Sequence, residues 1–278
     1  MMGLRDRGVE IKSPEQIAAM RRAGLVVGET LELLRGHVRA GVSTRELDAV
    51  AEDNIRSSGA TPSFLGYHGF PGSICASVND EVVHGIPGDR VLAEGDVVSI
   101  DCGAIMPDDS GQGWHGDAAI TVAVGAVRDE VTELMRVTEE AMWRGIAAAR
   151  LGGRVTDISA AVERHVRSQG SYGILEDYTG HGIGSAMHQP PDVPNYGRAG
   201  RGPKLVRGLA LAVEPMVTLG GKDVSTLDDD WTVVADDGSW AAHFEHTFTL
   251  TEDGAWVLTA LDGGEAALTA LGVPFGGR

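Results

Sequence analysis

The stretch Gly180-His181-Gly182-Ile183-Gly184-Ser185-Ala186-Met187-His188 places two histidines seven residues apart in a glycine-rich segment. Glycine has no Cβ atom, so such a segment lets the backbone pass close to other groups. A single histidine in a loop is more often structural than functional, so the stretch needs support from other parts of the chain. Residues on both sides of it supply that support.

Four carboxylates flank this stretch in apolar surroundings. Asp101 and Asp117 each lie at the end of an apolar, strand-like run, and Glu214 and Glu245 each lie inside one. A carboxylate buried without a partner is costly, and four of them close together repel one another. We therefore expect these four carboxylates and His181 to hold a pair of metal ions.

The charge and the donor atoms of these ligands limit the choice of metal and indicate its chemistry. Four carboxylates balance the charge of two divalent cations, and oxygen donors of this kind favour manganese, iron or cobalt over a zinc site built on thiolates. Zinc remains a further candidate. Two cations about 3.5–4 Å apart can share a water molecule, lower its pKa and polarise a carbonyl group. The pattern therefore predicts a metal-dependent hydrolase.

Each residue has a plainer interpretation when it is considered alone. Asp101 resembles an ordinary turn residue, and Met187 and Trp231 resemble core residues. Glu214 is harder to explain in this way, because it lies within the run Leu-Ala-Leu-Ala-Val-Glu-Pro-Met-Val of residues 209–217. The order and surroundings of the residues together favour a functional site.

The composition is typical of a soluble globular protein, with 42% hydrophobic and 23% charged residues. A chain of 278 residues can form one large domain or two closely packed halves. It has no apolar run long enough for a transmembrane helix, and Met1–Lys12 lacks the apolar centre of a signal peptide. Cys75 and Cys102 form no CxxC pair and are too few for a disulfide framework, so we expect a cytoplasmic protein.

The net charge of −17 argues against nucleic acid or an anionic membrane as a tight partner, because no basic face is available. We expect no more than a weak association with ribosomes. Since the sequence shows no apolar interface stripe, we expect a monomer.

A weak internal repeat predicts two similar halves. A shift of 111 residues aligns segment 39–70 with segment 150–181 and gives nine identities, among them Tyr67 with Tyr178 and Gly69 with Gly180. Such a repeat indicates two halves, each a helix pair followed by strands, with a site between them. We expect a single domain over 1–278, with halves at about 13–123 and 124–260 and a peripheral tail at 263–278.

Local patterns predict the elements of each half. Capping boxes at Ser13 and Ser43 mark two helix starts. Apolar or alternating runs predict further helices and the strands, at 130–149, 156–168, 74–78, 97–101, 117–122, 209–217, 231–234 and 243–250. The strand ending at Asp101 and the strand beginning at Asp117 should form a hairpin. Pro215 suggests an edge or a bulge.

In combination these motifs resemble those of the type I methionine aminopeptidases, in their bacterial form, over about residues 10–260. The resemblance rests on Asn79-Asp80-Glu81-Val82-Val83-His84-Gly85-Ile86-Pro87, Gly95-Asp96-Val97-Val98-Ser99-Ile100-Asp101, His115-Gly116-Asp117, Gly180-His181-Gly182-Ile183-Gly184, His188, Glu214-Pro215-Met216, Trp231-Thr232 and Phe244-Glu245-His246-Thr247. It implies the α/β pita-bread fold, in which two pseudo-symmetric halves share an antiparallel sheet with helices outside. This agrees with the repeat.

The resemblance also implies roles for individual residues. The implied metal ligands are Asp101, Asp117, His181, Glu214 and Glu245, of which Asp117 and Glu245 bridge both ions. Glu214 would also act as general base. His84 and His188 would lie beside the scissile bond, one contacting the amide nitrogen and the other stabilising the oxyanion. The implied methionine pocket is lined by Tyr67, Phe70, Cys75, Met187 and Trp231. The family removes the initiator methionine of nascent proteins when the second residue is small.

The chain departs from the family pattern in three places. The segment between Asp101 and Asp117 is several residues longer than usual, with Met106–Gln112 as the expected insertion. Met187 replaces a common aromatic residue, and Phe64 replaces a smaller one. These changes leave the ligands intact but could reshape the pocket.

Two other functions fit the same fold. A proline-directed aminopeptidase would share the metal set, but such enzymes usually carry an extra N-terminal domain, for which 278 residues leave no room. A non-catalytic pita-bread binding protein would have lost metal ligands, whereas here all five positions are occupied. Bound metal and peptide cleavage would discriminate between them.

Overall fold

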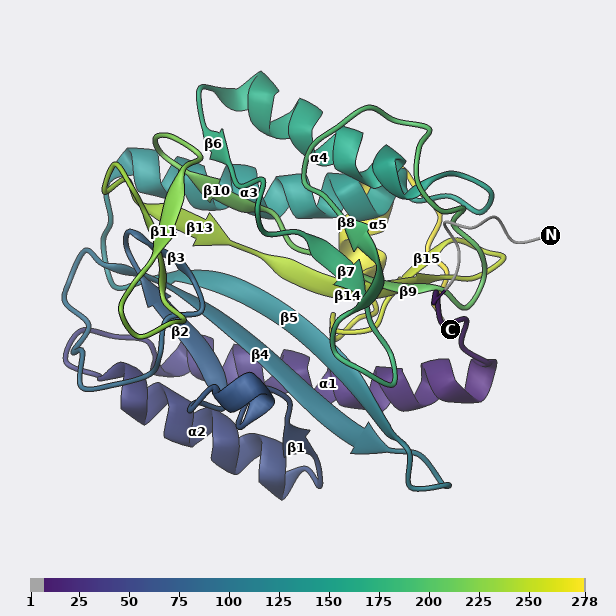
Figure 1. Cartoon of the computed structure of the whole chain (residues 1–278), viewed down its shortest axis with the longest axis horizontal. Helices are drawn as coiled ribbons and strands as arrows, with labels where there is room; N and C mark the ends of the chain where they lie inside the picture. Colours follow the sequence, from purple (N-terminus) through teal and green to yellow (C-terminus); the bar gives the residue numbers. More distant parts are fainter. Residues whose placement is uncertain (1–7, 278) are drawn as a thin grey trace.

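Residues 8–277, the part of the chain that the computed structural model describes, form two helix pairs on opposite sides of a curved sheet (Figure 1). The first pair is α1 (Pro14–His37) and α2 (Thr44–Ser57), and the second is α3 (Asp129–Ala148) and α4 (Val155–Gln169). A short helix, α5 (Glu265–Ala270), lies near the end of the chain. Most of segment 1–12, in which we expect no signal peptide, lies outside the described residues.

Capping side chains explain where the first two helices begin. The Ser13 hydroxyl accepts a hydrogen bond from the Gln16 amide, and the Gln16 side chain accepts one from the Ser13 amide. Ser43 and Glu46 make the same reciprocal pair at the start of α2. Each box satisfies two amides that the first helical turn leaves unpaired, and both predicted helix starts are confirmed.

The strands form three antiparallel sheets. The strands are β1 (Thr61–Pro62), β2 (Ile74–Val78), β3 (Glu81–Val83), β4 (Val97–Pro107), β5 (Gly113–Ala123), β6 (Gly173–Ile174), β7 (Gly180–Gly182), β8 (Gln189–Val193), β9 (Ala210–Val213), β10 (Met216–Thr218), β11 (Val224–Thr226), β12 (Val233–Ala235), β13 (Ala241–His243), β14 (Glu245–Leu250) and β15 (Ala255–Val257). The largest sheet has nine strands, in the order β1-β4-β5-β14-β9-β7-β8, with β2 on β4 and β15 on β14. The smaller sheets are β13-β10-β6 and β11-β12-β3.

The order of the elements agrees with the internal repeat. The shift of 111 residues moves α2 onto residues 155–168, and α4 spans Val155–Gln169. The same shift moves the end of α1 from residue 37 to residue 148, where α3 ends. The antiparallel sheets with helices outside confirm the predicted fold class. The half boundaries at 13–123 and 124–260 stay a prediction.

Two predicted strands are interrupted at the same place. The run 209–217 forms β9 and β10 with Glu214 and Pro215 between them, and the run 243–250 forms β13 and β14 with Phe244 between them. At both breaks the chain passes between the nine-stranded sheet and the β13-β10-β6 sheet. Proline lacks the amide hydrogen that a continuous ladder needs, which agrees with the irregularity expected at Pro215. Glu214 and Glu245 therefore lie at a corner of the sheet.

The predicted end of the first aspartate strand is wrong. β4 continues through Asp101 to Pro107, and β5 begins at Gly113, so Asp101 and Asp117 both lie in the middle of long strands. The register pairs Asp101 with Ala119 and Gly103 with Asp117. The small residues Cys102, Gly103 and Ala104 are buried, and the ladder with β5 continues through them beyond the point where the charge suggested a turn. The expected insertion forms the tip of this hairpin.

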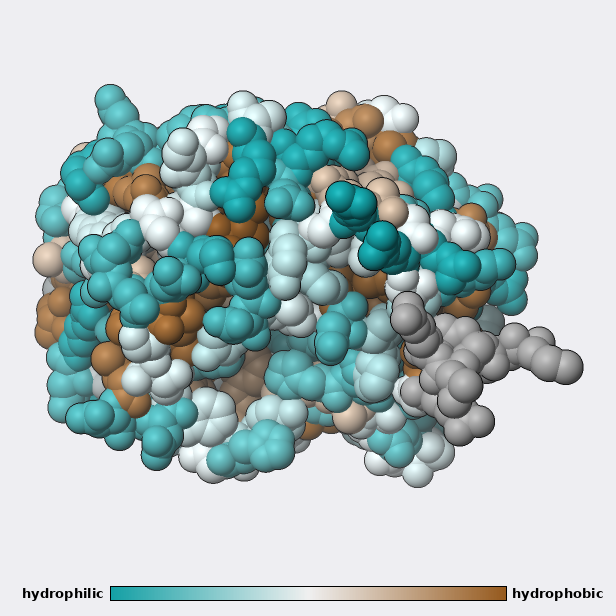
Figure 2. Space-filling view, turned by 45° about the horizontal axis from the view of Figure 1, so that its top comes forward, coloured by the Kyte–Doolittle hydropathy of each residue, from teal (hydrophilic) through white to brown (hydrophobic). Residues whose placement is uncertain are grey.

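The surface is mostly polar, and the C-terminal tail packs onto the core. Figure 2 shows a mostly hydrophilic face with apolar side chains set into hollows between polar ones. In the tail, Leu268 is fully buried in the main hydrophobic core. Among residues 8–277, no helix combines the length and apolarity that a membrane span requires.

Candidate metal centre and substrate pocket

One cavity of about 520 Å³ gathers every residue that the sequence analysis assigns to a site. Its lining includes all twelve of them: Tyr67, Phe70, Cys75, His84, Asp101, Asp117, His181, Met187, His188, Glu214, Trp231 and Glu245. These residues come from both halves of the chain. The cavity is also lined by Phe64, Tyr178 and His243.

Four carboxylates meet at one end of this cavity without enough hydrogen-bond donors. Within residues 8–277, Asp101 Oδ1, Asp117 Oδ1 and Glu245 Oε1 are buried oxygens that lack a hydrogen-bond partner. Buried polar atoms are normally paired, so unpaired oxygens gathered in one place indicate a missing positive partner. This donor set fits divalent cations, which accept carboxylate oxygens and imidazole nitrogens.

The electrostatics of the cluster lead to the same conclusion. Burial raises the pKa of Asp101 to about 7, with Glu214 adding to the shift and His243 opposing it. Burial raises the pKa of Glu214 to about 8. Burial and then repulsion from neighbouring carboxylates hold the pKa of Asp117 and of Glu245 well above the usual range. The protein alone therefore does not stabilise four charged carboxylates here, and cations would.

Among the described residues, potential ligand atoms form two groups that share one residue. Asp117, His181 and Glu245 offer atoms within 4.8 Å of one another, and so do Glu214, His243 and Glu245. The sequence analysis did not assign His243 to the site. Its signal was present, because His243 lies two residues before Glu245 in a run of alternating strand residues, where such pairs share a face.

His181 is held by the main chain of its strand. A Cβ atom on Gly180 would lie 2.3 Å from the Ala212 carbonyl oxygen, and one on Gly182 would lie 2.3 Å from that of Pro190. Only glycine permits this close approach on either side of the histidine. The His181 Nδ1 atom lies 3.0 Å from the Gly182 carbonyl oxygen, which therefore accepts its proton. This leaves Nε2, 3.4 Å from Glu214 Oε1, free to bind a metal.

Two further imidazoles, those of His84 and His188, line the same cavity. The His188 ring lies 4.3 Å from the His181 ring between centroids, and its Nδ1 atom is 2.9 Å from the Tyr67 hydroxyl. His84 has a φ of 60°, in the left-handed region that a non-glycine residue rarely adopts. Burial, followed by His243 and His188, lowers the pKa of His84 to about 4. Such backbone strain is typical of a functional position.

The apolar part of the cavity is a separate small cluster. Its buried members are Phe64, Phe70, Cys75 and Met187, and Tyr67, Ile86 and Trp231 pack against them. The Phe70 and Trp231 rings meet edge to face, with centroids 5.1 Å apart. The five residues expected to line a methionine pocket thus lie together.

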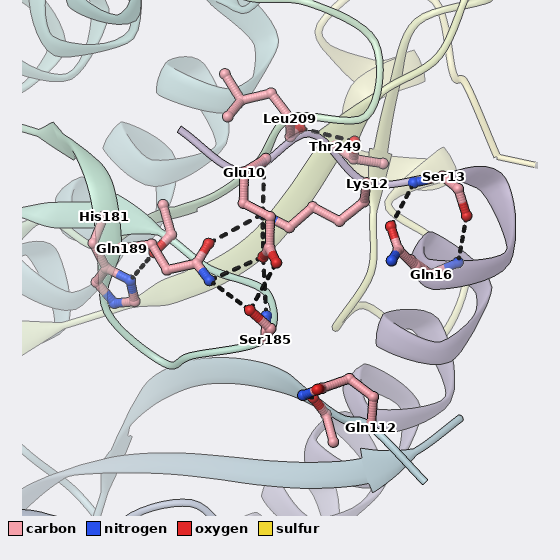
Figure 3. Close-up of polar contacts among 12 residues, drawn as sticks. Glu10, Lys12, Ser13, Gln16, Gln112, His181, Ser185, Gln189, Leu209 and Thr249 are labelled. Atoms are coloured by element: carbon pink, nitrogen blue, oxygen red, sulfur yellow. Dashed lines mark hydrogen bonds and ion pairs between the residues drawn. The ribbon is translucent and has the colours of Figure 1, made fainter. Parts of the chain in front are cut away.

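The loop that carries Met187 and His188 is fastened to the N-terminal segment (Figure 3). The Glu10 carboxylate accepts hydrogen bonds from the Ser185 amide at 3.0 Å, the Ser185 hydroxyl at 2.7 Å and the Gln189 side chain at 2.9 Å. Burial alone would raise the pKa of Glu10, but these bonds from Ser185 and Gln189 lower it. No pattern in the sequence points to this contact.

Lys12 completes the fastening. Its ammonium group donates to the Gln189 side chain at 3.3 Å and lies 3.4 Å from the Glu10 carboxylate. The Lys12 side chain is only 1% exposed. Burial lowers its pKa to about 8, although Glu10 opposes the shift. We refer to Glu10, Lys12, Ser185 and Gln189 as the N-terminal clamp.

Comparisons with known proteins agree with this site. The family model of Metallopeptidase family M24 matches residues 18–252. The methionine aminopeptidase of Clostridium acetobutylicum is 52% identical over 250 residues, which cover 90% of this chain and 98% of that protein. The crystal structure of methionine aminopeptidase from Thermotoga maritima has a TM-score of 0.87 at 40% identity and covers 91% of this chain and 99% of that chain.

A more distant structure shares the fold alone. The prolidase from Pyrococcus furiosus has a TM-score of 0.70 at 22% identity and covers 92% of this chain but 66% of that chain. The high identities, over nearly the full length of both partners, are to methionine aminopeptidases. The chain therefore belongs to metallopeptidase family M24 and, within it, to the methionine aminopeptidases.

Proposed function

We propose that this chain removes the N-terminal methionine from nascent proteins whose second residue is small, using two divalent cations. The proposed ligands are Asp101, Asp117, His181, Glu214 and Glu245. One observation carries the proposal: the cluster of unpaired carboxylates, the apolar pocket and the imidazoles of His84 and His188 all line the same cavity. Neither a proline-directed peptidase nor a binding protein is favoured by the comparisons.

Glu214 is the proposed general base. It lies in the carboxylate cluster with an imidazole beside each of its oxygens, so it is placed to take up a proton at the proposed metal site and release it again. When bound, the cations would supply a water of lowered pKa and polarise the scissile carbonyl. Glu214 accepts the proton that this water loses and can pass it to the leaving amine.

His84 and His188 orient the scissile bond. Burial lowers the pKa of both imidazoles, so both are neutral at neutral pH and each can offer one N–H. The Tyr67 hydroxyl fixes Nδ1 of His188, which leaves Nε2 to face the substrate. One imidazole contacts the amide nitrogen, and the other stabilises the charge that develops on the carbonyl oxygen.

The apolar pocket selects the methionine side chain. Phe64, Phe70, Cys75 and Met187 are all buried and present no charge to it. An unbranched thioether fills such a pocket well and makes favourable contacts with the edges of aromatic rings. The thioether of Met187 itself adds a flexible wall, so the pocket can adapt closely to the substrate.

The metal, the location and the partners are proposed from the sequence. Cobalt, manganese or iron are the proposed cations, with zinc as a further candidate. A monomer in the cytoplasm that associates weakly with ribosomes, and binds neither a membrane nor nucleic acid tightly, stays a prediction.

Peptide cleavage by metal-stripped protein, with manganese, cobalt, iron or zinc added back singly, tests the proposal. The peptides are Met-Ala-Ser, Met-Leu-Ser, Ala-Ala-Ser and Ala-Pro-Ser. We expect metal-dependent release of methionine from Met-Ala-Ser and little from the other three. Cleavage of Ala-Pro-Ser would favour the proline-directed alternative, and no cleavage with any metal would favour a binding protein.

A further inference from the structure

The Glu214 carboxylate lies between two imidazoles, one beside each oxygen. His181 Nε2 is 3.4 Å from Oε1, and His243 Nε2 is 3.6 Å from Oε2. His181 is one of the proposed metal ligands, whereas His243 has no role in the mechanism so far. An almost completely buried imidazole beside the proposed general base calls for an explanation.

The two imidazoles differ in how their protons are placed. The Gly182 carbonyl fixes the proton of His181 on Nδ1 and leaves Nε2 bare, as a metal ligand requires. Nothing in residues 8–277 forms a hydrogen bond with Nε2 of His243, and this atom is buried. With its proton on Nε2, His243 would aim a donor at Oε2 of Glu214. Their separation of 3.6 Å is longer than a hydrogen bond, and a small rotation of the carboxylate would close it. Such a rotation would pair the buried nitrogen of His243.

Hydrogen bonds to Thr121 and strand pairing hold the main chain of His243 in this place. Its amide donates to the Thr121 hydroxyl at 2.9 Å, and that hydroxyl donates to the His243 carbonyl at 2.9 Å. β10 pairs with β13 so that Met216 lies opposite His243. On the other side, the Asn195 side chain donates to the Glu214 carbonyl at 3.0 Å. A side chain on such a support can fix the direction of its partner.

We propose that His243 is a positioning residue whose Nε2–H donates to Oε2 of Glu214 and keeps Oε1 directed toward His181. This rests on the proposed role of Glu214 as ligand and base. Without the donor, the carboxylate can rotate about its last bond at the break between β9 and β10. The metals would still be held by the other carboxylates and His181, but the base would lose its orientation.

Two amide substitutions test the role of this one nitrogen. In His243→Gln the side-chain amide nitrogen reaches the position of Nε2, whereas in His243→Asn it reaches only that of Nδ1. We expect His243→Asn to lower kcat about 10–100-fold, as is typical when the partner of a metal ligand is lost. His243→Gln should restore kcat to within about fivefold of the wild type. KM and the Kd for manganese, measured by calorimetry, should change less than about threefold in both.

His246→Asn is the matched control. His246 is near in sequence, and its Nδ1 atom lies 2.8 Å from the Thr259 hydroxyl, a contact that asparagine can keep. This variant should retain the wild-type kcat.

Three results would overturn the proposal. If His243→Asn keeps the wild-type kcat, the imidazole does not position Glu214. If both substitutions weaken manganese binding more than tenfold, His243 is itself a metal ligand. If His243→Gln is as slow as His243→Asn with normal metal binding, the Nε2 donor is not what matters. Wild-type protein that binds metal but releases no methionine would instead contradict the proposed function.

Discussion

His181 and His188 lie seven residues apart in the chain, yet the protein fixes them by different means. His181 is enclosed by its own strand, β7, whose glycines allow neighbouring carbonyls to approach closely. His188 is on a loop held by side chains from elsewhere, the Tyr67 hydroxyl and the N-terminal clamp. Main-chain contacts thus support the metal-side histidine, and side-chain contacts support the substrate-side histidine.

This difference has a functional consequence. A main-chain support cannot be removed by changing one side chain, so the metal ligand is insulated from most substitutions around it. The substrate side depends on a few individual hydrogen bonds and can be adjusted one contact at a time. Substitutions on the two sides should therefore separate metal binding from turnover.

The largest expected effect is that of His181→Ala. Removing the imidazole deprives the proposed metal ions of one ligand. We therefore expect loss of bound metal and a fall in kcat of about 10⁴-fold or more. Elemental analysis of the purified, folded variant and methionine release from Met-Ala-Ser measure both effects. Normal metal content with substantial activity would show that His181 is not a ligand.

His188→Ala should impair turnover without affecting metal binding. We expect kcat to fall about 10²-fold while the metal content stays normal, because one donor beside the scissile bond is lost. The same two assays apply. If this variant loses its metal instead, His188 is a ligand and the division between the two histidines is wrong.

Glu10→Ala tests whether the clamp acts at a distance on the loop. It removes an acceptor shared by Ser185 and Gln189, so we expect kcat to fall about tenfold through poorer placement of His188, with metal binding unchanged. Glu15→Ala, at an exposed carboxylate in the same part of the chain, is the control and should match the wild type. Equal rates in all three proteins would mean that the clamp is structural only.

The smallest expected effect is a pH dependence of the stability of the metal-free protein. It arises from the carboxylate cluster and not from the clamp. The raised pKa values of Asp101, about 7, and Glu214, about 8, mean that the metal-free folded protein holds protons that the unfolded chain releases near pH 4. Its stability should therefore fall as the pH rises from about 5 to about 7.

Calorimetry of metal-stripped protein measures this as a lower Tm at the higher pH. Saturating manganese should abolish the trend, and Glu10→Ala should leave its slope unaltered because the clamp lies outside the cluster. A Tm that rises with pH in the metal-free wild type would contradict the raised pKa values.

Local signals in the sequence predicted the helix starts, while longer-range packing decided where the strands break and end. The capping boxes at Ser13 and Ser43 need only four residues each, so they were readable without the structure. The break at Phe244 was not, because it depends on which sheets the chain joins on either side. The strand through Asp101 was predicted too short, because a charged residue was taken as its end.

The two residues that the sequence analysis missed differ in kind. His243 could have been found by extending the alternation of its strand two residues upstream of Glu245. Glu10 could not, because its partner Ser185 is 175 residues away and neither residue belongs to a recognisable pattern.

Because Lys12 is buried, the reactivity of its amine can serve as a probe of clamp opening. The chain has three lysines, Lys12, Lys204 and Lys222, and Lys12 is the one enclosed by the clamp. After reductive methylation with ¹³C-formaldehyde, their methyl signals should be few enough to assign by substitution. The Lys12 signal should appear late, when the clamp opens, because the closed clamp buries its amine. The rate at which it appears would then report how often the loop bearing His188 is released during turnover.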